Sequence, residues 1–213
     1  MALECIIFDC DGVILESVDA KNQAFVRVCS DIDPAFCGLF QAFTELHGGM
    51  SRTEKFAWLI REIHGREITA EEMRGLCEKF VRYCREAVLA SPLVPGFEDT
   101  AKRWLGKTPM YVASGTPHYE LVEILEARGL DRYFAGILGT PPAKAALLVN
   151  ILRDAGANPN ATVMVGDSKT DADAALIAGT KFYGRGPFFA GKPCPNGPDL
   201  TGLNAFLERL ALE

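Results

Sequence analysis

Residues 5–17 read Cys-Ile-Ile-Phe-Asp-Cys-Asp-Gly-Val-Ile-Leu-Glu-Ser, and this segment carries the most informative pattern in the chain. A short apolar, β-branched run leads into Asp9, Asp11 and Gly12, as is typical of a buried parallel strand that ends in a turn. Open α/β sheets bind ligands beyond the carboxyl ends of their strands, where both carboxylates would lie. Two acids beside an apolar core repel each other unless a cation or a proton lies between them. The segment therefore indicates a metal site; the simpler alternative is an Asp-Gly turn with a solvated second aspartate.

The composition is that of a soluble globular protein. Hydrophobic residues make up 48% of the 213 residues and charged residues 23%, which suits one α/β domain with a sizeable insertion, or a core with a small second domain. The net charge of −6 and the pI near 5.2 argue against a nucleic-acid partner, because nucleic-acid binders normally carry a basic face. No apolar run approaches the length of a membrane span.

The seven cysteines show neither Cys-x-x-Cys nor Cys/His zinc spacing, so neither a disulfide framework nor a zinc site is expected. This cysteine usage is typical of a reducing compartment. The chain also runs directly into its first expected strand without a signal peptide. We therefore expect a cytoplasmic protein with no membrane partner.

Residues 16–90 show helical periodicity and no convincing strand. Four helices are expected, over residues 20–29, 36–46, 53–64 and 70–89, and Thr69-Ala-Glu-Glu72 is a capping box at the start of the last. The segment Ser91-Pro-Leu-Val-Pro-Gly96 is a rigid linker of the kind that bounds a domain. The expected division is an α/β core of residues 1–15 and 91–213, with residues 16–90 as an inserted all-helical cap domain.

After the linker, strands alternate with helices. Strands are expected over residues 109–113, 134–138, 161–165 and 181–183, and helices over 97–105, 118–128, 144–156 and from 168 to 178. This alternation predicts a Rossmann-like α/β fold, a parallel sheet with helices on both faces and right-handed crossovers. The Gly/Pro-rich residues 184–198 are expected to form a surface loop, and residues 200–212 a closing helix.

Polar groups follow four of the expected strands, and a parallel sheet would place all of them at one edge. They are Asp9 with Asp11, Ser114 with Thr116, Lys144, and Asp167 with Asp171. Taken singly, each has a structural explanation: Ser-Gly-Thr-Pro suits a helix start, Lys144 a solvated charge, and Asp167 a helix cap. Together they supply what a site for phosphate and a metal ion requires.

The motifs resemble those of the haloacid dehalogenase superfamily of phosphohydrolases, in the subgroup with a helical (C1) cap after the first strand, which includes phosphoglycolate phosphatases and β-phosphoglucomutases. The segment Asp9-Cys-Asp-Gly-Val13 is similar to the family's first motif, Ser114 to its second and Lys144 to its third. The segment Gly166-Asp-Ser-x-x-Asp171 is similar to the fourth. The resemblance covers the whole expected core, whereas residues 16–90 match in placement and helical character more than in sequence.

The resemblance implies that Asp9 is the nucleophile, which forms an aspartyl-phosphate, and that Asp11 is first the general acid and then the general base. Ser114 and the backbone of Gly115 would bind phosphoryl oxygens at a helix start. Lys144 would neutralise both the phosphate and Asp9.

The implied cofactor is Mg2+, because hard oxygen ligands suit this ion and it keeps water while bridging to phosphate. Its implied ligands are the Asp9 carboxylate, the Asp11 backbone carbonyl and Asp167. Asp171 lies one helical turn beyond Asp167 and would hold a metal-bound water or orient Lys144.

Substrate choice is expected to depend on the helical insertion, where His47-Gly-Gly-Met-Ser-Arg52 lies between two helices. Two glycines allow close approach to a ligand, and a cation nearby could contact an anionic or hydroxylated group. The candidate substrate contacts are His47, Gly49, Arg52 and Lys55. The alternative is a helix–helix turn with solvated charges.

The expected function is Mg2+-dependent hydrolysis of a small phosphorylated metabolite, a sugar phosphate or a phosphoglycolate-like acid, by a monomer or a homodimer. In related sugar-phosphate mutases the insertion carries a Lys in this loop and a His on its first helix. Gly48 and Lys21 stand at those places here, which disfavours a mutase but leaves it as an alternative. Another alternative is a regulatory protein phosphorylated on Asp9 without turnover, which the adjacent base Asp11 disfavours. The residues do not identify the metabolite.

Overall fold

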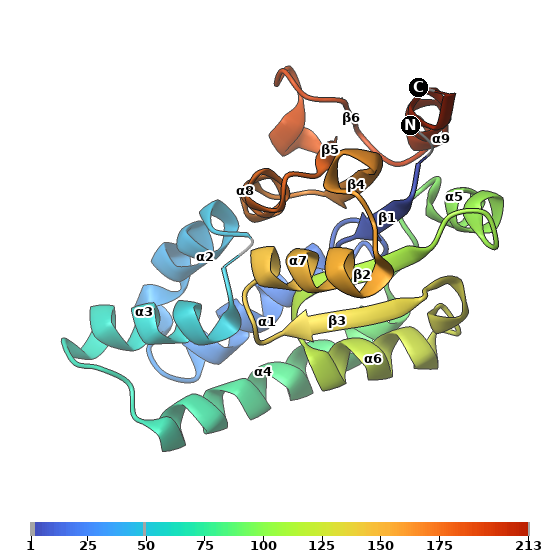
Figure 1. Ribbon diagram of the computed structural model, residues 1–213. Coiled ribbons are helices and arrows are strands. Elements are labelled where there is room, and N and C mark those ends of the chain that lie inside the picture. The colour runs from blue at the N-terminus through green and yellow to red at the C-terminus, as the bar shows by residue number, and fades with distance from the viewer. Residues whose placement is uncertain (1–2, 49, 213) are drawn as a thin grey trace. The chain divides into compact units, whose positions relative to one another are not determined.

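The computed structural model describes residues 3–48 and 50–212, and this part of the chain forms two compact units (Figure 1). The α/β unit comprises Met1–Glu16 and Pro92–Glu213, and the helical unit comprises Ser17–Ser91. Each junction lies one residue beyond the division expected from the sequence.

A parallel sheet is the framework of the α/β unit. Its described strands are β1 (Cys5–Phe8), β2 (Met110–Pro117), β3 (Gly136–Thr140), β4 (Thr162–Gly166), β5 (Lys181–Arg185) and β6 (Asn196–Gly197). They lie in the order β3-β2-β1-β4-β5-β6, and every neighbouring pair is parallel. The chain leaves β1 for β2 and β3 on one side and then crosses to β4 on the other. The carboxyl ends of β1 and β4 therefore flank the topological switch point, where open α/β sheets bind their ligands.

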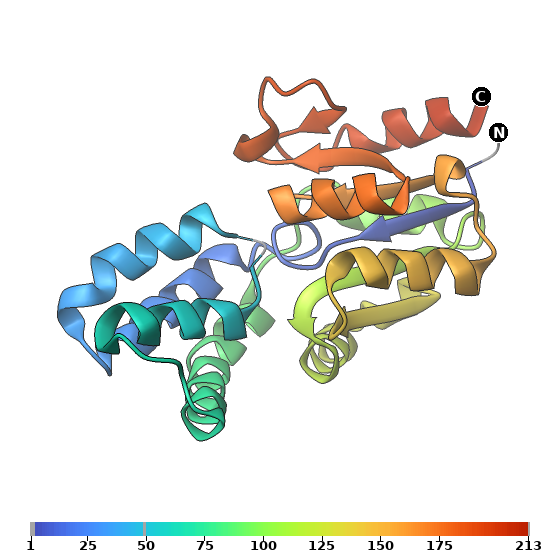
Figure 2. The same cartoon turned by 60° about the vertical axis from the view of Figure 1, so that its left-hand side comes forward.

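Helices cover both faces of this sheet, which confirms the fold class expected from the sequence. They are α5 (Phe97–Trp104), α6 (His118–Ala127), α7 (Lys144–Ala155), α8 (Lys169–Ala178) and α9 (Leu203–Leu212). Right-handed crossovers place α5 and α6 on one face and α7 and α8 on the other, because the two halves of the chain cross the sheet in opposite directions. Figure 2 shows α7 and α8 in front of the sheet and α5 and α9 behind it.

Strand β1 is buried on both faces, which explains why its sequence is apolar without alternation. Ile7 belongs to one core cluster with Leu148 of α7 and Ala175 of α8. Phe8 points to the opposite face, where its ring centroid lies 5.7 Å from that of Phe97 in α5. A slip of β1 by one residue would exchange the side chains that pack on its two faces, so packing on both sides fixes the register of the strand. The residues that follow Phe8 consequently have a fixed place at the edge of the sheet.

The four helices expected in the insertion are all present in the helical unit. They are α1 (Val18–Ser30), α2 (Cys37–Leu46), α3 (Arg52–His64) and α4 (Ala70–Ala90). Their core is aromatic and centres on Phe25 of α1. The centroid of this ring lies 6.0 Å from that of Phe40, 5.4 Å from that of Phe56 and 4.3 Å from that of Phe80. One ring from each helix thus meets in a single packed centre.

Capping boxes and short 3₁₀ turns mark several element ends. The capping box expected at Thr69 is present at the start of α4, and Ser51 forms another at the start of α3. The described 3₁₀ helices are η1 (Pro34–Phe36), η2 (Asp131–Tyr133), η3 (Pro159–Ala161) and η4 (Pro187–Phe189). Across the described ranges, no helix combines the length and the apolar character that crossing a bilayer requires.

The expectation of a plain surface loop over residues 184–198 is wrong. Gly184 and Arg185 end β5, η4 follows, and β6 pairs with the end of β5. Gly184 and Arg185 pair with Asn196 and Gly197, twelve residues further along the chain. Glycine at 184 also leaves room for packing, since a Cβ there would lie 2.4 Å from the Phe189 ring. Strand β2 also continues four residues beyond its expected end at Ala113.

Candidate active site

Asp9 and Asp11 lie immediately beyond the carboxyl end of β1, at the topological switch point of the sheet. The Asp9 N–H donates to the Val165 carbonyl at 3.0 Å, so the pairing of β1 with β4 continues to this residue, and Asp9 is only 6% exposed. Gly12 then turns the chain with a φ of +75°, and its N–H donates to the Leu15 carbonyl at 2.7 Å. A side chain at this φ would be strained, which explains the glycine.

Lys144, the first residue of α7, is a buried cation between two carboxylates. Its Nζ lies 2.9 Å from Asp9 Oδ2 and also contacts Asp171 Oδ1. Burial by itself lowers the pKa of Lys144, but the charges of Asp171 and Asp9 outweigh it and hold this pKa above its ordinary value. Lys144 is therefore protonated, and it neutralises part of the negative charge at this edge of the sheet.

Asp171, in the first turn of α8, is fully buried and uses both of its oxygens within the protein. While Oδ1 contacts Lys144, Oδ2 accepts from the Asp167 N–H at 3.2 Å, the Ser168 N–H at 3.0 Å and the Ser168 hydroxyl at 2.7 Å. These bonds fix both the Lys144 ammonium and the turn between β4 and α8. Asp171 therefore orients other groups rather than facing a ligand itself.

Gly166→Ala is expected to destabilise the protein, because the end of β4 has no room for a side chain. A Cβ at this position would lie 2.2 Å from Asp171 Cβ and 2.5 Å from its carboxyl carbon, so either the strand or Asp171 must move. Overpacking of this kind typically costs about 1–3 kcal/mol. Denaturant unfolding measures it, with Gly75→Ala in α4 as the matched control, since a Cβ there meets nothing within 4 Å. A Gly166→Ala protein as stable as the unmodified chain would show that Asp171 can shift freely.

Ser114 and Thr116 place two hydroxyls at the end of β2, next to β1. The buried Ser114 Oγ accepts from the Thr116 N–H at 3.2 Å, which leaves its own O–H as a donor. The Thr116 hydroxyl donates to Asp11 Oδ2 at 2.9 Å. The sequence motifs give Thr116 no role separate from that of Ser114. Its position at the end of the strand beside β1 is the signal that points to contact with Asp11.

The carboxylates of Asp9, Asp167 and Asp171 could hold a metal ion, since they offer oxygens that lie within 4.8 Å of one another. Burial raises the pKa of Asp9 to about 6, against the opposing charge of Lys144. Burial and the charges of Asp171 and Asp9 likewise raise the pKa of Asp167 well above its ordinary value. The single positive charge of Lys144 thus does not neutralise the negative charges of these carboxylates. A negatively charged site whose donors are all oxygens fits a hard divalent cation. Asp171 is fully buried and already has four polar contacts, whereas Asp9 Oδ1 accepts, among the described residues, a single hydrogen bond, from the Cys10 N–H at 2.7 Å. The carboxylates best suited to such an ion are therefore Asp9 and Asp167.

The substrate contacts expected in the helical unit have packing partners within that unit. His47 Nδ1 lies 2.9 Å from the Phe43 carbonyl, and the Arg52 guanidinium lies 4.6 Å from the Phe80 ring centroid. Lys55 is 3% exposed, with Nζ 3.4 Å from the Thr44 carbonyl. Gly49 lies outside the described residues. Contact of these four residues with a substrate stays a prediction.

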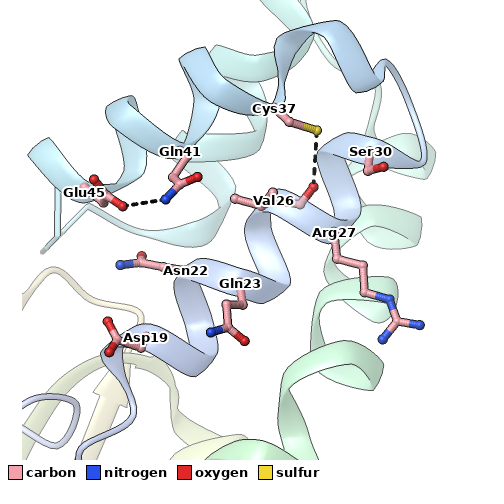
Figure 3. Close-up of a pocket in the computed structure, with 9 residues that line it drawn as sticks. All are labelled: Asp19, Asn22, Gln23, Val26, Arg27, Ser30, Cys37, Gln41 and Glu45. Carbon is pink, nitrogen blue, oxygen red and sulfur yellow. Dashed lines mark hydrogen bonds between the residues drawn. The ribbon is translucent and has the colours of Figure 1, made fainter.

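A groove of about 480 Å³ lies between α1 and α2 within the helical unit, and most of the residues that line it have polar side chains (Figure 3). Its walls include Asp19 and Arg27 from α1 and Cys37 and Glu45 from α2, and the Cys37 Sγ points to the Val26 carbonyl at 3.7 Å. Of the substrate contacts expected from the sequence, the three described residues His47, Arg52 and Lys55 do not line this groove.

A model of the haloacid dehalogenase-like hydrolase family matches residues 3–179. This match covers most of the chain, including the acids after β1, the hydroxyls after β2, Lys144 and the β4–α8 turn. The chain therefore belongs to the haloacid dehalogenase-like hydrolases.

Among individual proteins, the chain is similar to phosphoglycolate phosphatase 1 of Pseudomonas aeruginosa, with 27% identity over 184 residues. The match covers 83% of this chain and 66% of the relative, so the chain spans just under two thirds of that relative's length. Its fold is similar to that of a β-phosphoglucomutase from Clostridium difficile, with a TM-score of 0.80, 18% identity and coverage of 100% and 98% of the two chains. It is also similar to the structure of a predicted phosphoglycolate phosphatase from Haemophilus somnus 129PT, with a TM-score of 0.76, 22% identity and coverage of 96% and 97%.

Proposed function

We propose that the protein is a Mg2+-dependent phosphatase that hydrolyses a small phosphorylated metabolite through an aspartyl-phosphate on Asp9. The observation that carries this proposal is the buried contact of Lys144 with both Asp9 and Asp171 at the switch point of the sheet. A carboxylate and an anionic phosphate repel each other, so attack by the carboxylate requires positive charge nearby. The ammonium group of Lys144 supplies this charge beside Asp9.

In the first step, a carboxylate oxygen of Asp9 attacks phosphorus, and the bond between phosphorus and the ester oxygen breaks. A pKa of about 6 leaves Asp9 mostly ionised at neutral pH, so it can act as a nucleophile without losing a proton first. The leaving oxygen takes a proton from Asp11. The hydrogen bond from the Thr116 hydroxyl holds the Asp11 carboxyl group in one orientation for this transfer.

In the second step, water attacks phosphorus and the bond to the Asp9 oxygen breaks, which releases phosphate and regenerates the carboxylate. Asp11, now ionised, accepts the proton of the attacking water. The Ser114 O–H and the backbone N–H of Gly115 would bind phosphoryl oxygens, and Lys144 would neutralise them. Asp11 thus gives up one proton in the first step and regains one in the second, so it returns to its starting state.

The residues suited to hold Mg2+ are the carboxylates of Asp9 and Asp167 and the backbone carbonyl of Asp11. When bound, the ion would supply positive charge beside the phosphoryl oxygens, in a site where acids outnumber Lys144. Asp171 supports this arrangement from behind, since its Oδ2 fixes the backbone N–H of Asp167.

The similarity to phosphoglycolate phosphatases supports phosphoglycolate, or another small acid or sugar carrying one phosphate, as the substrate. His47, Gly49, Arg52 and Lys55 of the helical unit remain the proposed substrate contacts. The β-phosphoglucomutase similarity extends to the fold, and no residue described above favours transfer of the phosphoryl group to a second sugar hydroxyl over transfer to water.

The proposal predicts that phosphate release depends on Mg2+ and on Asp167. Turnover of p-nitrophenyl phosphate and phosphoglycolate, followed by phosphate release, should stop with EDTA and return with excess Mg2+. Asp167→Asn should lower kcat/KM by at least about 100-fold, since loss of a ligand costs no less than loss of an outer-shell partner. Asp173→Asn is the matched control, because this aspartate of α8 lies six residues beyond Asp167 and pairs with Lys169 at the surface. Turnover unchanged by EDTA, or equal losses in the two variants, would contradict the proposal.

A further inference from the structure

Arg185, the last residue of β5, contacts the loop that follows β1, although β4 lies between these two strands. Its Nη1 donates to the Gly12 carbonyl at 3.1 Å, and its Nη2 donates to the Glu16 carboxylate. The Arg185 side chain is 16% exposed, so water screens these contacts less than it screens those of a surface pair. All three residues belong to the α/β unit.

The loop that Arg185 contacts is the one that carries Asp11. Residues 10–16 form a compact turn in which the N–H groups of Ile14 and Leu15 donate to the Cys10 carbonyl at 2.8 and 3.0 Å. Gly12 directly follows Asp11, so a bond that fixes the Gly12 carbonyl also limits how the Asp11 backbone can rotate. The Asp11 side chain is held from the other direction, by the Thr116 hydroxyl of β2.

The Arg185 guanidinium makes these two hydrogen bonds while its third kind of N–H donor, at Nε, is left without an acceptor in the described part of the chain. Within the described residues, Arg185 Nε is buried without a hydrogen-bond partner. A buried N–H without a partner is costly. The side chain nonetheless keeps a position in which both of its terminal nitrogens face the loop after β1.

We propose that Arg185 is a positioning residue for the reaction: it holds the Gly12–Glu16 loop so that Asp11 can protonate the leaving oxygen. This inference rests on the proposed phosphatase function. The competing explanation is that Arg185 only adds positive charge that attracts an anionic substrate. The two explanations predict different effects of losing Arg185 on kcat/KM. Loss of electrostatic attraction would lower kcat/KM equally for every phosphate monoester. A misplaced Asp11 would lower kcat/KM only for esters whose leaving group needs a proton.

Leaving-group dependence therefore tests the inference. p-Nitrophenolate leaves without protonation, while the alkoxide of phosphoglycolate needs the proton of Asp11. We expect Arg185→Met to lower kcat/KM by about 10–100-fold for phosphoglycolate and by no more than about 3-fold for p-nitrophenyl phosphate, a part of the 10²–10⁴ that general acid catalysis supplies. Arg185→Lys, which can keep one of the two bonds, should fall between. Equal losses for both esters would overturn the inference in favour of simple attraction.

A matched control and a second measurement separate this inference from the proposed function. Arg103→Met removes a guanidinium that pairs with Glu208 at the surface and should leave both kcat/KM values unchanged. Amide hydrogen exchange of residues 10–16 needs no turnover, and it should be at least about 10-fold faster in Arg185→Met than in Arg103→Met. If the unmodified protein hydrolyses neither ester, the proposed function fails, and faster exchange still supports the tether. Unchanged exchange would overturn the role of Arg185 whatever the activity.

Discussion

Replacing Asp9 by Asn is expected to abolish phosphate release while leaving the protein at least as stable as before. The amide is not a nucleophile, so turnover should fall by roughly 10⁴–10⁶-fold, the range seen when a covalent nucleophile is removed. Stability should not fall, because burial raises the pKa of Asp9 from 3.8 to about 6. A carboxyl group whose pKa is higher in the folded than in the unfolded protein lowers the free energy of unfolding as the pH rises through these two pKa values. At pH 7 this destabilisation by Asp9 is complete. The Asn side chain carries no charge, so Asp9→Asn removes the destabilisation.

Two measurements on the same Asp9→Asn sample check this expectation. Phosphate release from p-nitrophenyl phosphate gives the activity, and urea unfolding at pH 7 gives the free energy of unfolding. Residual turnover within about 10-fold of the unmodified protein would exclude Asp9 as the nucleophile. A clear loss of stability would show that the Asp9 charge supports the fold, against the direction of its pKa.

Replacing Lys144 by Met is expected to destabilise the protein, unlike the replacement of Asp9 by Asn. Lys144 is the buried cation between Asp9 and Asp171, and its removal leaves both carboxylates without that partner. Breaking a buried ion pair from one side typically costs about 3–5 kcal/mol. Activity should also be lost, because the phosphate and the nucleophile would then repel each other without compensation. Lys144→Met should therefore be both inactive and markedly less stable.

The matched control for Lys144 is Lys169→Met. Lys169 pairs with Asp173 on the exposed side of α8, with a side chain that is 74% exposed, and such surface pairs contribute at most about 1 kcal/mol. Urea unfolding of the two variants compares a buried with an exposed lysine–aspartate pair in the same unit. Equal stabilities would contradict the central structural role given to Lys144.

The sequence predicts the sheet well because its signals are local. The apolar run of β1 and the acids behind it follow directly from residues 5–12, and the alternation of strands and helices gives a parallel sheet. The end of β5 and β6 escape prediction because these two segments pair with each other across an intervening turn, Gly184 with Asn196 and Arg185 with Gly197. The Gly/Pro-rich composition of residues 184–198 is typical of a loop and gives no sign of this pairing.

The candidate site shows the same division between local and non-local information. The strand ends suffice to bring Asp9, Lys144 and Asp171 together, since a parallel sheet gathers them at one edge. The contacts of Asp11 depend instead on side-chain reach: Thr116 extends from β2, and Arg185 holds the adjacent Gly12 from β5. A role for Arg185 was hidden because it lies in the segment that resembles a loop.

The helical unit shows why candidate substrate contacts are harder to assign from sequence. Arg52 and Lys55 are spaced as one expects of residues that face a ligand, yet both cations lie over aromatic rings, those of Phe80 and Phe25. A charged residue near a loop has several possible partners, and periodicity does not distinguish them. The acids of the α/β unit are different, because the strand before them fixes where they lie.

Trapping the phosphorylated protein shows whether the phosphoryl group passes through Asp9. The unmodified protein is mixed with p-nitrophenyl phosphate and Mg2+, quenched in acid during turnover, digested and examined by mass spectrometry. We expect an acid-stable, base-labile phosphoryl group on the peptide that contains Asp9, and none on the same peptide of Asp9→Asn. A phosphoryl group on any other residue, or steady phosphate release without a phosphorylated Asp9, would contradict it.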